Sequence, residues 1–320
     1  MPSRDDLTAK LRSIPELDVR TDVPLAPHTR FAIGGPADFF LTSRSPEALA
    51  AGVSLLEAAA TPWTALGEGS NVIVADEGYR GAIVRYTGDA LRIDGDQVYA
   101  ETGLTLQTLV SATIDAGLAG LHTLERIPGS VGGAVYGNAG AYGHQVDELL
   151  TETSYLEDGA VQVADNAACR FSYRESVFKS SKQRIILSCR LRMPTAAADE
   201  LREQAREIRT VRDEKFPPAM RCAGSVFKNL FLADLPADAQ TIVPERAVRG
   251  GKVASAFFLE QVGAKGMRRG GIHIAPYHAN LIYNEDGGSA ADLRSLIDEL
   301  KRRVHDRFGI DVEEEVQYIG

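Results

Sequence analysis

The stretch Ile127–Gly143, which reads IPGSVGGAVYGNAGAYG, limits the possible folds of this chain more than any other stretch. Six of its seventeen residues are glycine, and none is charged. Each glycine in a helix interior costs about 1 kcal/mol relative to alanine, so the composition argues against an ordinary helix. Val131 and Val135 favour burial, which argues against a flexible linker. We predict an ordered segment that either packs tightly between buried strands or wraps a large, flat, phosphate-bearing cofactor.

A second glycine-rich segment is the tight turn Gly67-Glu68-Gly69-Ser70-Asn71, which lies between two apolar runs. Gly67 and Gly69 match the first two glycines of the dinucleotide-binding fingerprint. Val72 occupies the third position, however, and a short strand is expected after it where the fingerprint requires a helix. We therefore do not predict a Rossmann fold, although the backbone amides of this turn could hold a pyrophosphate.

Composition narrows the function classes. The 320 residues can bury the cores of two or three subdomains, and the net charge of −9 argues against a nucleic-acid-binding protein. Three cysteines and six histidines show no metal-ligand spacing, so we expect reduced thiols and no metal site. The charged N-terminus and the absence of a long apolar run predict a cytoplasmic protein without a membrane partner.

Periodicity predicts an alternation of helices and strands. Helices are expected over 5–17, after the capping residue Ser45, over 105–117, over 201–212 and near 253–261, and after Ser289 up to Gly309. Residues 152–193 are typical of strands, with a hairpin turn at Asp158-Gly159, and the tail 311–320 is expected to be a strand. The small residues of Pro194–Asp199 indicate the main domain boundary.

Three polar residues lie in otherwise apolar or glycine-rich surroundings. Arg174 in SYRES either presents its guanidinium to a carboxylate or phosphate or forms a structural ion pair, for example with Glu175. Ser225 in CAGSVFKN is either a proton donor or a turn residue, and Glu315 is either functional or an ordinary solvated glutamate. Considered one at a time, each residue favours its structural role over a functional one: an ion pair for Arg174, a turn for Ser225 and a solvated surface position for Glu315.

The order of the motifs changes that balance. HTRFAIGGPADF, GEGSNV, IPGSVGGAVYGNAGAYG, FSYRESVFK, CAGSVFKN, HANLIYN and VEEEVQYIG follow one another over about residues 21–319. In this order they resemble the UDP-N-acetylenolpyruvoylglucosamine reductase family, in its shorter branch, which lacks an extra substrate-clamping loop. Only 50 residues separate Arg174 from Ser225, which is too few for that loop.

The resemblance implies an α+β fold with an FAD-binding domain of the vanillyl-alcohol-oxidase type and a smaller substrate domain. The FAD-binding domain would be 1–195, in subdomains of about 1–86 and 87–195, and the substrate domain 196–320, with the strand 311–320 returning to the first domain. The implied activity is the NADPH-dependent, FAD-mediated reduction of UDP-N-acetylglucosamine enolpyruvate to UDP-N-acetylmuramate. This is a step of bacterial peptidoglycan synthesis, and a monomer is expected.

The same resemblance assigns roles to residues. Arg174 and Glu315 would polarise the substrate carboxylate, and Ser225 would protonate the carbanion. The residues implied to contact FAD are Gly67, Glu68, Gly69, Ser70, Asn71, Pro128, Gly129, Gly132, Gly133, Asn138, Gly140 and Ala141. Those implied to contact the UDP-sugar are Tyr173, Lys228, Asn229 and His278. Because the GEGSN turn holds no histidine or cysteine, we expect the FAD to be non-covalent.

Two departures from the family pattern lie on the substrate side. Leu230 stands where the family often has proline, and Ala275-Pro276-Tyr277 precedes His278 where the short branch often has a serine and a lysine. The alternative function is another FAD-dependent oxidoreductase of the same fold that acts on a sugar or an alcohol. Such an enzyme would not need the arginine, serine and glutamate together.

Overall fold

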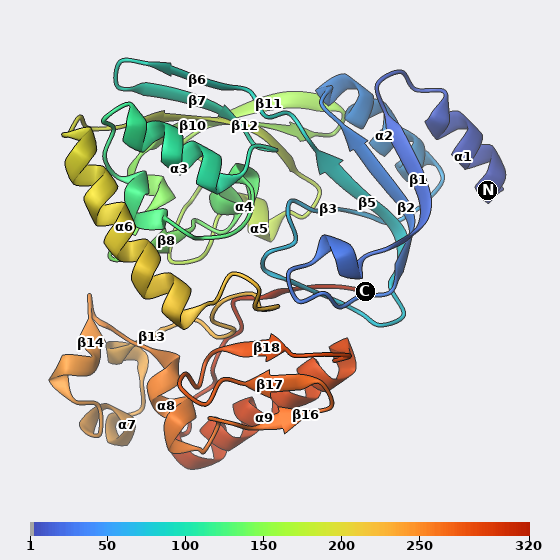
Figure 1. Cartoon of the computed structure of the whole chain (residues 1–320). Coiled ribbons are helices and arrows are strands. Elements are labelled where there is room, and N and C mark those ends of the chain that lie inside the picture. The colour runs from blue at the N-terminus through green and yellow to red at the C-terminus, as the bar shows by residue number, and fades with distance from the viewer. Residues whose placement is uncertain (1–2) are drawn as a thin grey trace. The chain divides into compact units, whose positions relative to one another are not determined.

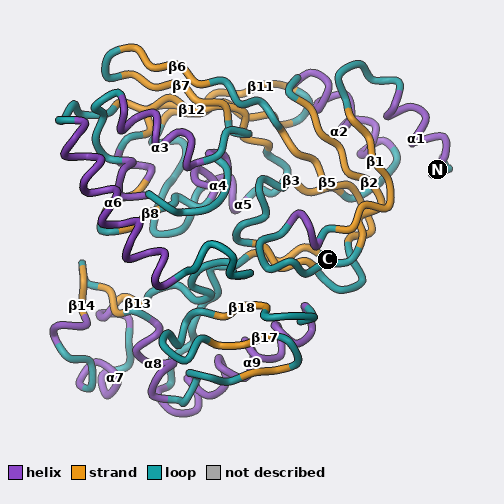
Figure 2. The backbone as a smooth tube through the Cα atoms, viewed as in Figure 1, coloured by secondary structure: helices purple, strands orange, loops and turns teal. Residues whose placement is uncertain are grey.

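The structure is a computed structural model, which describes residues 3–320 and divides the chain into two compact units (Figures 1 and 2). Unit 1 comprises Met1–Val23, Ala37–Glu68 and Arg80–Pro217. Unit 2 comprises Pro24–Pro36, Gly69–Tyr79 and Pro218–Gly320. Unit 2 therefore combines the last third of the chain with two short segments from its first quarter. The predicted domain boundaries near residues 86 and 195 stay predictions.

The elements of unit 1 form two main sheets and six helices within the described residues. The helices are α1 (Arg4–Arg12), α2 (Pro46–Ala58), α3 (Leu106–Asp115), α4 (Val131–Tyr136), α5 (Val177–Ser180) and α6 (Ala198–Lys215). The first sheet has the order β1-β2-β5-β3, from β1 (Asp18–Pro24), β2 (Pro36–Ser43), β5 (Tyr79–Tyr86) and β3 (Trp63–Ala65). The second has the order β11-β10-β12-β7-β6, from β11 (Ala160–Asp165), β10 (Leu150–Glu157), β12 (Ile185–Arg192), β7 (Gln97–Glu101) and β6 (Leu91–Asp94). A small ribbon joins β8 (Gly140–Ala141) and β9 (His144–Gln145).

Helices α1 and α2 cover one face of the first sheet (Figure 1). Leu11 of α1 and Leu49 of α2 share one buried cluster with Leu41 of β2 and Val84 of β5. Ser45 accepts a hydrogen bond from the Ala48 amide, and Pro46 is the first residue of α2. The predicted start of this helix is confirmed, because a capping serine and a proline at the first position are both local signals.

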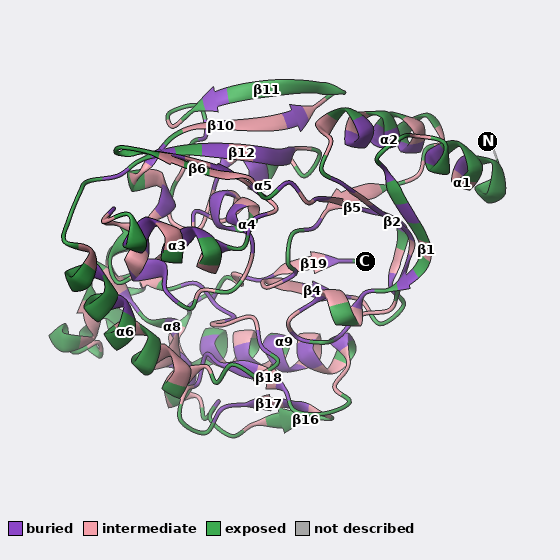
Figure 3. Cartoon of the chain, turned by 45° about the horizontal axis from the view of Figure 1, so that its top comes forward, coloured by how far each residue is buried: buried purple, intermediate pink, exposed green. Residues whose placement is uncertain are grey.

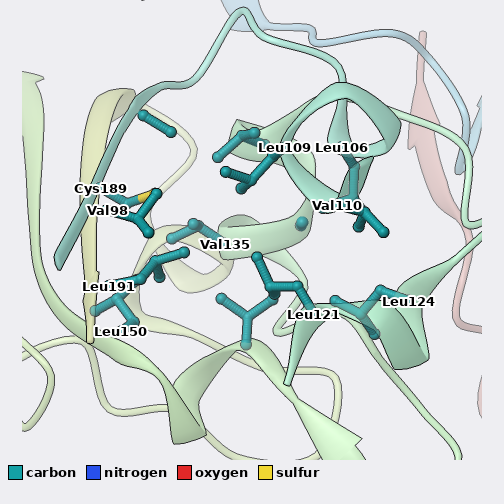
Figure 4. Packing of buried hydrophobic residues seen from close by; sticks show 14 of the residues in the cluster. Val98, Leu106, Leu109, Val110, Leu121, Leu124, Val135, Leu150, Cys189 and Leu191 are labelled. Atoms are coloured by element: carbon teal, nitrogen blue, oxygen red, sulfur yellow. The ribbon is translucent and has the colours of Figure 1, made fainter. Parts of the chain in front are cut away.

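The second sheet is antiparallel throughout and carries the larger core on one face. The predicted hairpin between β10 and β11 is confirmed, since Asp158 and Gly159 have φ of +50° and +74°, as a type I′ turn requires. Figure 4 shows Val135 of α4 between the strand residues Val98 and Leu191 and the α3 residue Leu109. Figure 3 shows β11 as a largely exposed edge strand.

The glycine run contains the six-residue helix α4, so the prediction that it avoids helix was wrong in part. Ser130 caps this helix by accepting a hydrogen bond from the Gly133 amide. The Gly132 amide donates to the Thr102 carbonyl, and a Cβ at Gly132 would lie 3.0 Å from Thr102 Cβ. Glycine thus lets the helix lie directly against the residue after β7, and the packing gained outweighs the low helix propensity.

Unit 2 is smaller and also mixes helices and strands. Its helices are α7 (Ala237–Thr241), α8 (Ser255–Gln261) and α9 (Ala290–Phe308). Two antiparallel three-stranded sheets have the orders β13-β15-β14 and β16-β17-β18. Their strands are β13 (Leu230–Phe231), β14 (Val248–Arg249), β15 (Lys252–Val253), β16 (Arg268–Arg269), β17 (Ile272–Ile274) and β18 (Ile282–Asn284). The last strand, β19 (Gln317–Ile319), pairs in parallel with β4 (Val72–Val74).

Helix α9 follows the sequence signals closely. Its predicted apolar face is fully buried: Leu293, Leu296, Ile297, Leu300 and Val304. Ser289 caps it, and Gly309 ends it in the left-handed conformation with φ of +65°. The carboxylate of Asp76 adds a second cap, since its two oxygens accept hydrogen bonds from the Ala290 and Ala291 amides at 2.8 and 2.9 Å.

The sequence predicts no membrane span, no metal site and reduced cysteines. In residues 3–320 no helix is long and apolar enough to cross a membrane. The described residues also hold no group of three or more histidine, cysteine, aspartate or glutamate side chains placed to bind a metal ion. Cys169, Cys189 and Cys222 are buried free thiols, as expected for reduced cysteines.

Candidate functional site

Arg174 occupies the strained position of a tight turn in unit 1. Ser172 and Glu175 exchange two backbone hydrogen bonds of 3.1 Å, which leaves Tyr173 and Arg174 as the two turn residues. Arg174 has φ of +61°, a conformation that a side chain makes unfavourable and that turns usually give to glycine or asparagine. Ten non-glycine residues among residues 3–320 have positive φ, so this conformation shows a backbone cost at Arg174 but does not by itself mark a functional residue.

The structure brings the SYRES motif against the glycine run. The Arg174 guanidinium donates to the Gly140 carbonyl at 2.7 Å and to the Asn138 carbonyl at 3.4 Å. It also lies over the Tyr173 ring, 5.2 Å from the ring centroid. The Ser176 hydroxyl donates to the Tyr136 carbonyl at 2.6 Å, which fixes the far end of the same turn to α4.

Asn138 joins the two segments from the interior. Its side chain is fully buried; the amide nitrogen donates to the Ser172 carbonyl at 3.1 Å and the amide oxygen accepts from the Asp147 N–H at 3.1 Å. The carbonyl of the same residue accepts from Arg174. These contacts give Asn138 a clear structural role in shaping the segment that was predicted to contact FAD.

The first part of the GEGSN turn lies beside the start of α4. A Cβ at Gly67 would lie 2.6 Å from the Ser130 hydroxyl oxygen, so the two glycine-rich segments approach each other closely. Arg85 lies next to this turn and donates from Nε to the Leu66 carbonyl at 3.2 Å. Its Nη2 is buried and has no hydrogen-bond partner within residues 3–320, and burial lowers the pKa of this guanidinium. The backbone amides of a glycine-rich turn next to an arginine fit the pyrophosphate of FAD, although Glu68 adds one negative charge to this turn.

Two ion pairs tie the entry of the glycine run to α6. The Glu125 carboxylate is 1% exposed and accepts hydrogen bonds from Arg209 of α6 at 2.8 Å and from Gln107 of α3 at 2.7 Å. Arg126 binds both carboxylate oxygens of Asp213 at 2.8 Å, and this contact lowers the pKa of Asp213. This network was not predicted from the sequence, although the adjacent charges of Glu125 and Arg126 directly before the uncharged run are a visible signal.

In unit 2 the segments of Ser225 and Glu315 lie side by side. Phe227 and Glu314 form an antiparallel bridge, and the Glu315 amide donates to the Val226 carbonyl at 2.7 Å. On its other side, Ser225 forms a bridge with Leu281. The segment that carries Ser225 therefore lies between residues 280–281 and 313–315.

Asn71 of the GEGSN turn fixes the segment of Glu315. Its side-chain amide donates to the Glu315 carbonyl at 3.0 Å, and its own carbonyl accepts from the Gln317 amide at 3.0 Å. Gly69 of the same turn has φ of +63°, and a Cβ there would lie 2.0 Å from the His28 carbonyl oxygen, so only glycine fits. The second part of the GEGSN turn is thus built into unit 2 beside a residue predicted to be catalytic.

Asn280, which the sequence analysis missed, holds the backbone next to Ser225. This side chain is 2% exposed; its oxygen accepts from the Phe227 amide at 2.9 Å. Its nitrogen donates to the Phe227 carbonyl and to the Ser255 hydroxyl, both at 2.8 Å. A buried asparagine with both ends satisfied fixes a backbone segment that has no regular strand partner.

The residues predicted to contact the UDP-sugar are distributed over both units. Tyr173 precedes Arg174 in unit 1. In unit 2, Lys228 is 7% exposed and pairs with Glu313, Asn229 is exposed, and His278 Nδ1 accepts from the Asn280 amide at 3.1 Å. The roles of these residues, like those of Arg174, Ser225, Glu315 and the FAD contacts, stay predictions.

Two protein-family models match large parts of the chain. Residues 37–162 match the family model of an FAD binding domain. Residues 216–319 match the model of the UDP-N-acetylenolpyruvoylglucosamine reductase C-terminal domain. These matches confirm the α+β flavoenzyme fold predicted from the sequence.

Similar proteins from several bacteria are UDP-N-acetylenolpyruvoylglucosamine reductases. The chain is 50% identical over 311 residues to the UDP-N-acetylenolpyruvoylglucosamine reductase of Solibacter usitatus, covering 97% of this chain and 100% of that protein. It is 34% identical over 305 residues to that of Bacillus subtilis, covering 94% of each. The crystal structure of the reductase from Thermus caldophilus superimposes with a TM-score of 0.74 at 27% identity, over 95% of this chain and 99% of that one. The chain therefore belongs to the UDP-N-acetylenolpyruvoylglucosamine reductase family.

Proposed function

We propose that this chain reduces UDP-N-acetylglucosamine enolpyruvate to UDP-N-acetylmuramate, with FAD as cofactor and NADPH as reductant, for peptidoglycan synthesis. The observation that carries this proposal is the 50% identity to a reductase of this name over 97% of the chain. It favours this reaction over the alternative of another FAD-dependent oxidoreductase acting on a sugar or an alcohol.

The chemistry that a bound FAD would supply is hydride transfer from NADPH to the double bond of the substrate. The chain provides the position and the electrostatic field for this chemistry. We assign the pyrophosphate to the turn Gly67–Asn71 and to the glycine run. The contacts with FAD then come from Gly67, Glu68, Gly69, Ser70, Asn71, Pro128, Gly129, Gly132, Gly133, Asn138, Gly140 and Ala141.

Hydride addition leaves negative charge on the carbon next to the substrate carboxylate. Arg174 and Glu315 polarise that carboxylate, so that the developing charge is spread and stabilised. The hydroxyl of Ser225 then gives its proton to the carbon. The hydrogen bonds from the Arg174 guanidinium to the Gly140 and Asn138 carbonyls support this role, since they hold the arginine against the glycine run.

We also propose the remaining assignments that the sequence and the family resemblance imply. Tyr173, Lys228, Asn229 and His278 bind the UDP-sugar. Residues 1–195 form the FAD-binding domain and residues 196–320 the substrate domain. The enzyme works as a cytoplasmic monomer, without nucleic acid or membrane partners.

The test follows oxidation of NADPH by the purified holoenzyme in the presence and absence of the enolpyruvyl sugar nucleotide. We expect oxidation that depends on this substrate. Ser225→Ala should lower it on the order of 100- to 1000-fold, while reduction of the bound flavin by NADPH alone is retained. Ser111→Ala, at an exposed position of α3, is the matched control and should keep full activity. Full turnover in Ser225→Ala would remove the proton-donor role, and oxidation that ignores the enolpyruvyl substrate would contradict the reaction itself.

A further inference from the structure

Lys179 makes an unusual contact with the backbone of Arg174. Its side chain is only 11% exposed, and its ammonium donates to the Arg174 carbonyl at 2.9 Å. The same ammonium pairs with the Glu175 carboxylate at 2.9 Å. A buried ammonium that donates to a carbonyl oxygen forms a charge-assisted hydrogen bond, which is stronger than a bond between neutral groups.

The backbone of Lys179 is held in place by buried neighbours. It lies in the short helix α5, where the preceding residue Phe178 is fully buried and meets the Tyr155 ring edge-on at a centroid distance of 5.2 Å. The first residue of the helix, Val177, donates its amide to the Cys169 carbonyl at 2.8 Å. The ammonium is therefore presented from a fixed element, on a stem that the surrounding residues cover.

The carbonyl that accepts the Lys179 hydrogen bond belongs to Arg174, the residue with the unfavourable backbone conformation. Arg174 at φ of +61° needs the surrounding structure to hold it there, because a side chain makes this conformation costly. The turn hydrogen bonds lie on Ser172 and Glu175, whereas Lys179 binds the Arg174 peptide itself. This contact fixes the direction of the peptide and with it the origin of the guanidinium.

We propose that Lys179 is a positioning residue, which holds the backbone of Arg174 so that its guanidinium meets the substrate carboxylate. This inference rests on the proposed function, in which Arg174 acts on the enolpyruvyl substrate. It predicts an effect confined to one half of the reaction. Reduction of the flavin by NADPH does not involve the enolpyruvyl carboxylate, whereas reoxidation of the reduced flavin by the enolpyruvyl substrate does.

The experiment measures the two halves separately, by anaerobic stopped-flow absorbance of the FAD-loaded enzyme. Lys179→Met keeps the apolar stem and removes the ammonium. Misplacing a group that orients the substrate costs on the order of 10- to 100-fold, so reoxidation by the enolpyruvyl substrate should slow by that factor. Reduction by NADPH should stay within twofold of the unaltered enzyme.

Three further variants isolate the contact. Lys179→Arg retains a charged N–H donor and should restore reoxidation to within about fivefold. Lys182→Met, at an exposed lysine three residues further along the chain, is the matched control and should behave as the unaltered enzyme. In the Arg174→Ala background, adding Lys179→Met should slow reoxidation no further, because a residue that acts through Arg174 has no effect without it.

Each contrary outcome has a separate meaning. If Arg174→Ala slows reoxidation but Lys179→Met does not, the positioning role is wrong and the function of Arg174 stands. If Arg174→Ala reoxidises at the normal rate, the proposed role of Arg174 is wrong and the positioning role falls with it. Equal slowing of both half-reactions in Lys179→Met, or loss of FAD from both Lys179 variants as judged by the flavin absorbance, would assign Lys179 to the fold alone.

Discussion

Replacing Arg174 by alanine and, separately, by glycine measures the backbone strain at the proposed catalytic arginine. Both variants remove the guanidinium, and with it the hydrogen bonds to the Gly140 and Asn138 carbonyls. The cost of those lost bonds is therefore common to the two variants. Their difference in unfolding free energy then reports the backbone preference of residue 174, in the folded chain, where φ is +61°, and in the unfolded chain.

The size of this difference follows from two opposing terms. A non-glycine residue in the left-handed region costs about 1–2 kcal/mol, and glycine avoids this cost. Glycine also gives the unfolded chain more freedom, which lowers stability by about 0.4–1 kcal/mol relative to alanine. We therefore expect Arg174→Gly to be more stable than Arg174→Ala by about 0.5–1 kcal/mol. Both should lose activity on the order of 100-fold or more, because neither carries the guanidinium.

The assay is urea unfolding of the holoenzyme variants, followed by circular dichroism and flavin fluorescence. The matched control is the same pair of substitutions at Lys182, an exposed residue without a positive φ, where alanine should be the more stable of the two. If alanine is equal to or more stable than glycine at position 174 as well, Arg174 does not hold the left-handed conformation. The backbone cost assigned to this turn would then be wrong.

The other predictions concern the framework of the two units. Glu125→Ala should cost about 1.5–3 kcal/mol of stability in urea unfolding, because the buried carboxylate accepts charge-assisted hydrogen bonds. Arg126→Ala should cost at most about 1 kcal/mol, since the side chains of Arg126 and Asp213 are 37% and 34% exposed. Equal costs of the two variants would contradict this ranking. Asp76→Ala should lower the free energy of unfolding by about 1–2 kcal/mol, because it removes the second cap of α9. Asp292→Ala, whose side chain is not a cap, is the comparison and should have a smaller effect. An unchanged unfolding free energy in Asp76→Ala would contradict the capping role. Burial raises the pKa of the Cys169 thiol to about 11 and of the Cys189 thiol to about 12, from 9.0. The stability that these neutral thiols contribute is complete below pH 9. It falls as the pH rises from 9 to about 11 for Cys169 and to about 12 for Cys189, because the unfolded chain loses its protons first. Cys189→Ala should reduce this fall by about 1 kcal/mol at pH 10, measured by urea unfolding with reductant present, and an unchanged pH profile would contradict the assigned shift.

Elements whose signals are local could be predicted from the sequence. Helix α9 is the clearest case, because its capping serine, its apolar face and its terminal glycine all act within one or two turns of the residue concerned. The hairpin at Asp158-Gly159 is another, since the turn residues alone select the conformation. The family could be recognised for the same reason: the motifs are short, contiguous and ordered along the chain.

Elements that depend on distant partners could not be predicted. Glycine content argued against a helix at α4, yet the close approach of Gly132 to Thr102 makes that helix favourable. Asn280 gives no sign in the sequence that both ends of its side chain will hold the Phe227 backbone. Lys179 differs from these cases, because its partner lies only five residues away; even so, the sequence alone does not indicate that its ammonium donates to the Arg174 carbonyl.

By itself the sequence determined the family, the FAD-dependent chemistry and the local conformations, because each of these is encoded in residues that are neighbours along the chain. Only the tertiary structure decided that residues 69–79 belong with the C-terminal unit, that Asn71 holds the segment of Glu315, and that Arg174 sits in a strained turn. The first two features arise from hydrogen bonds and packing between segments tens to hundreds of residues apart, which short-range propensities do not contain. The turn at Arg174 is itself short-range, but its guanidinium is fixed by the Gly140 and Asn138 carbonyls, 34 and 36 residues away.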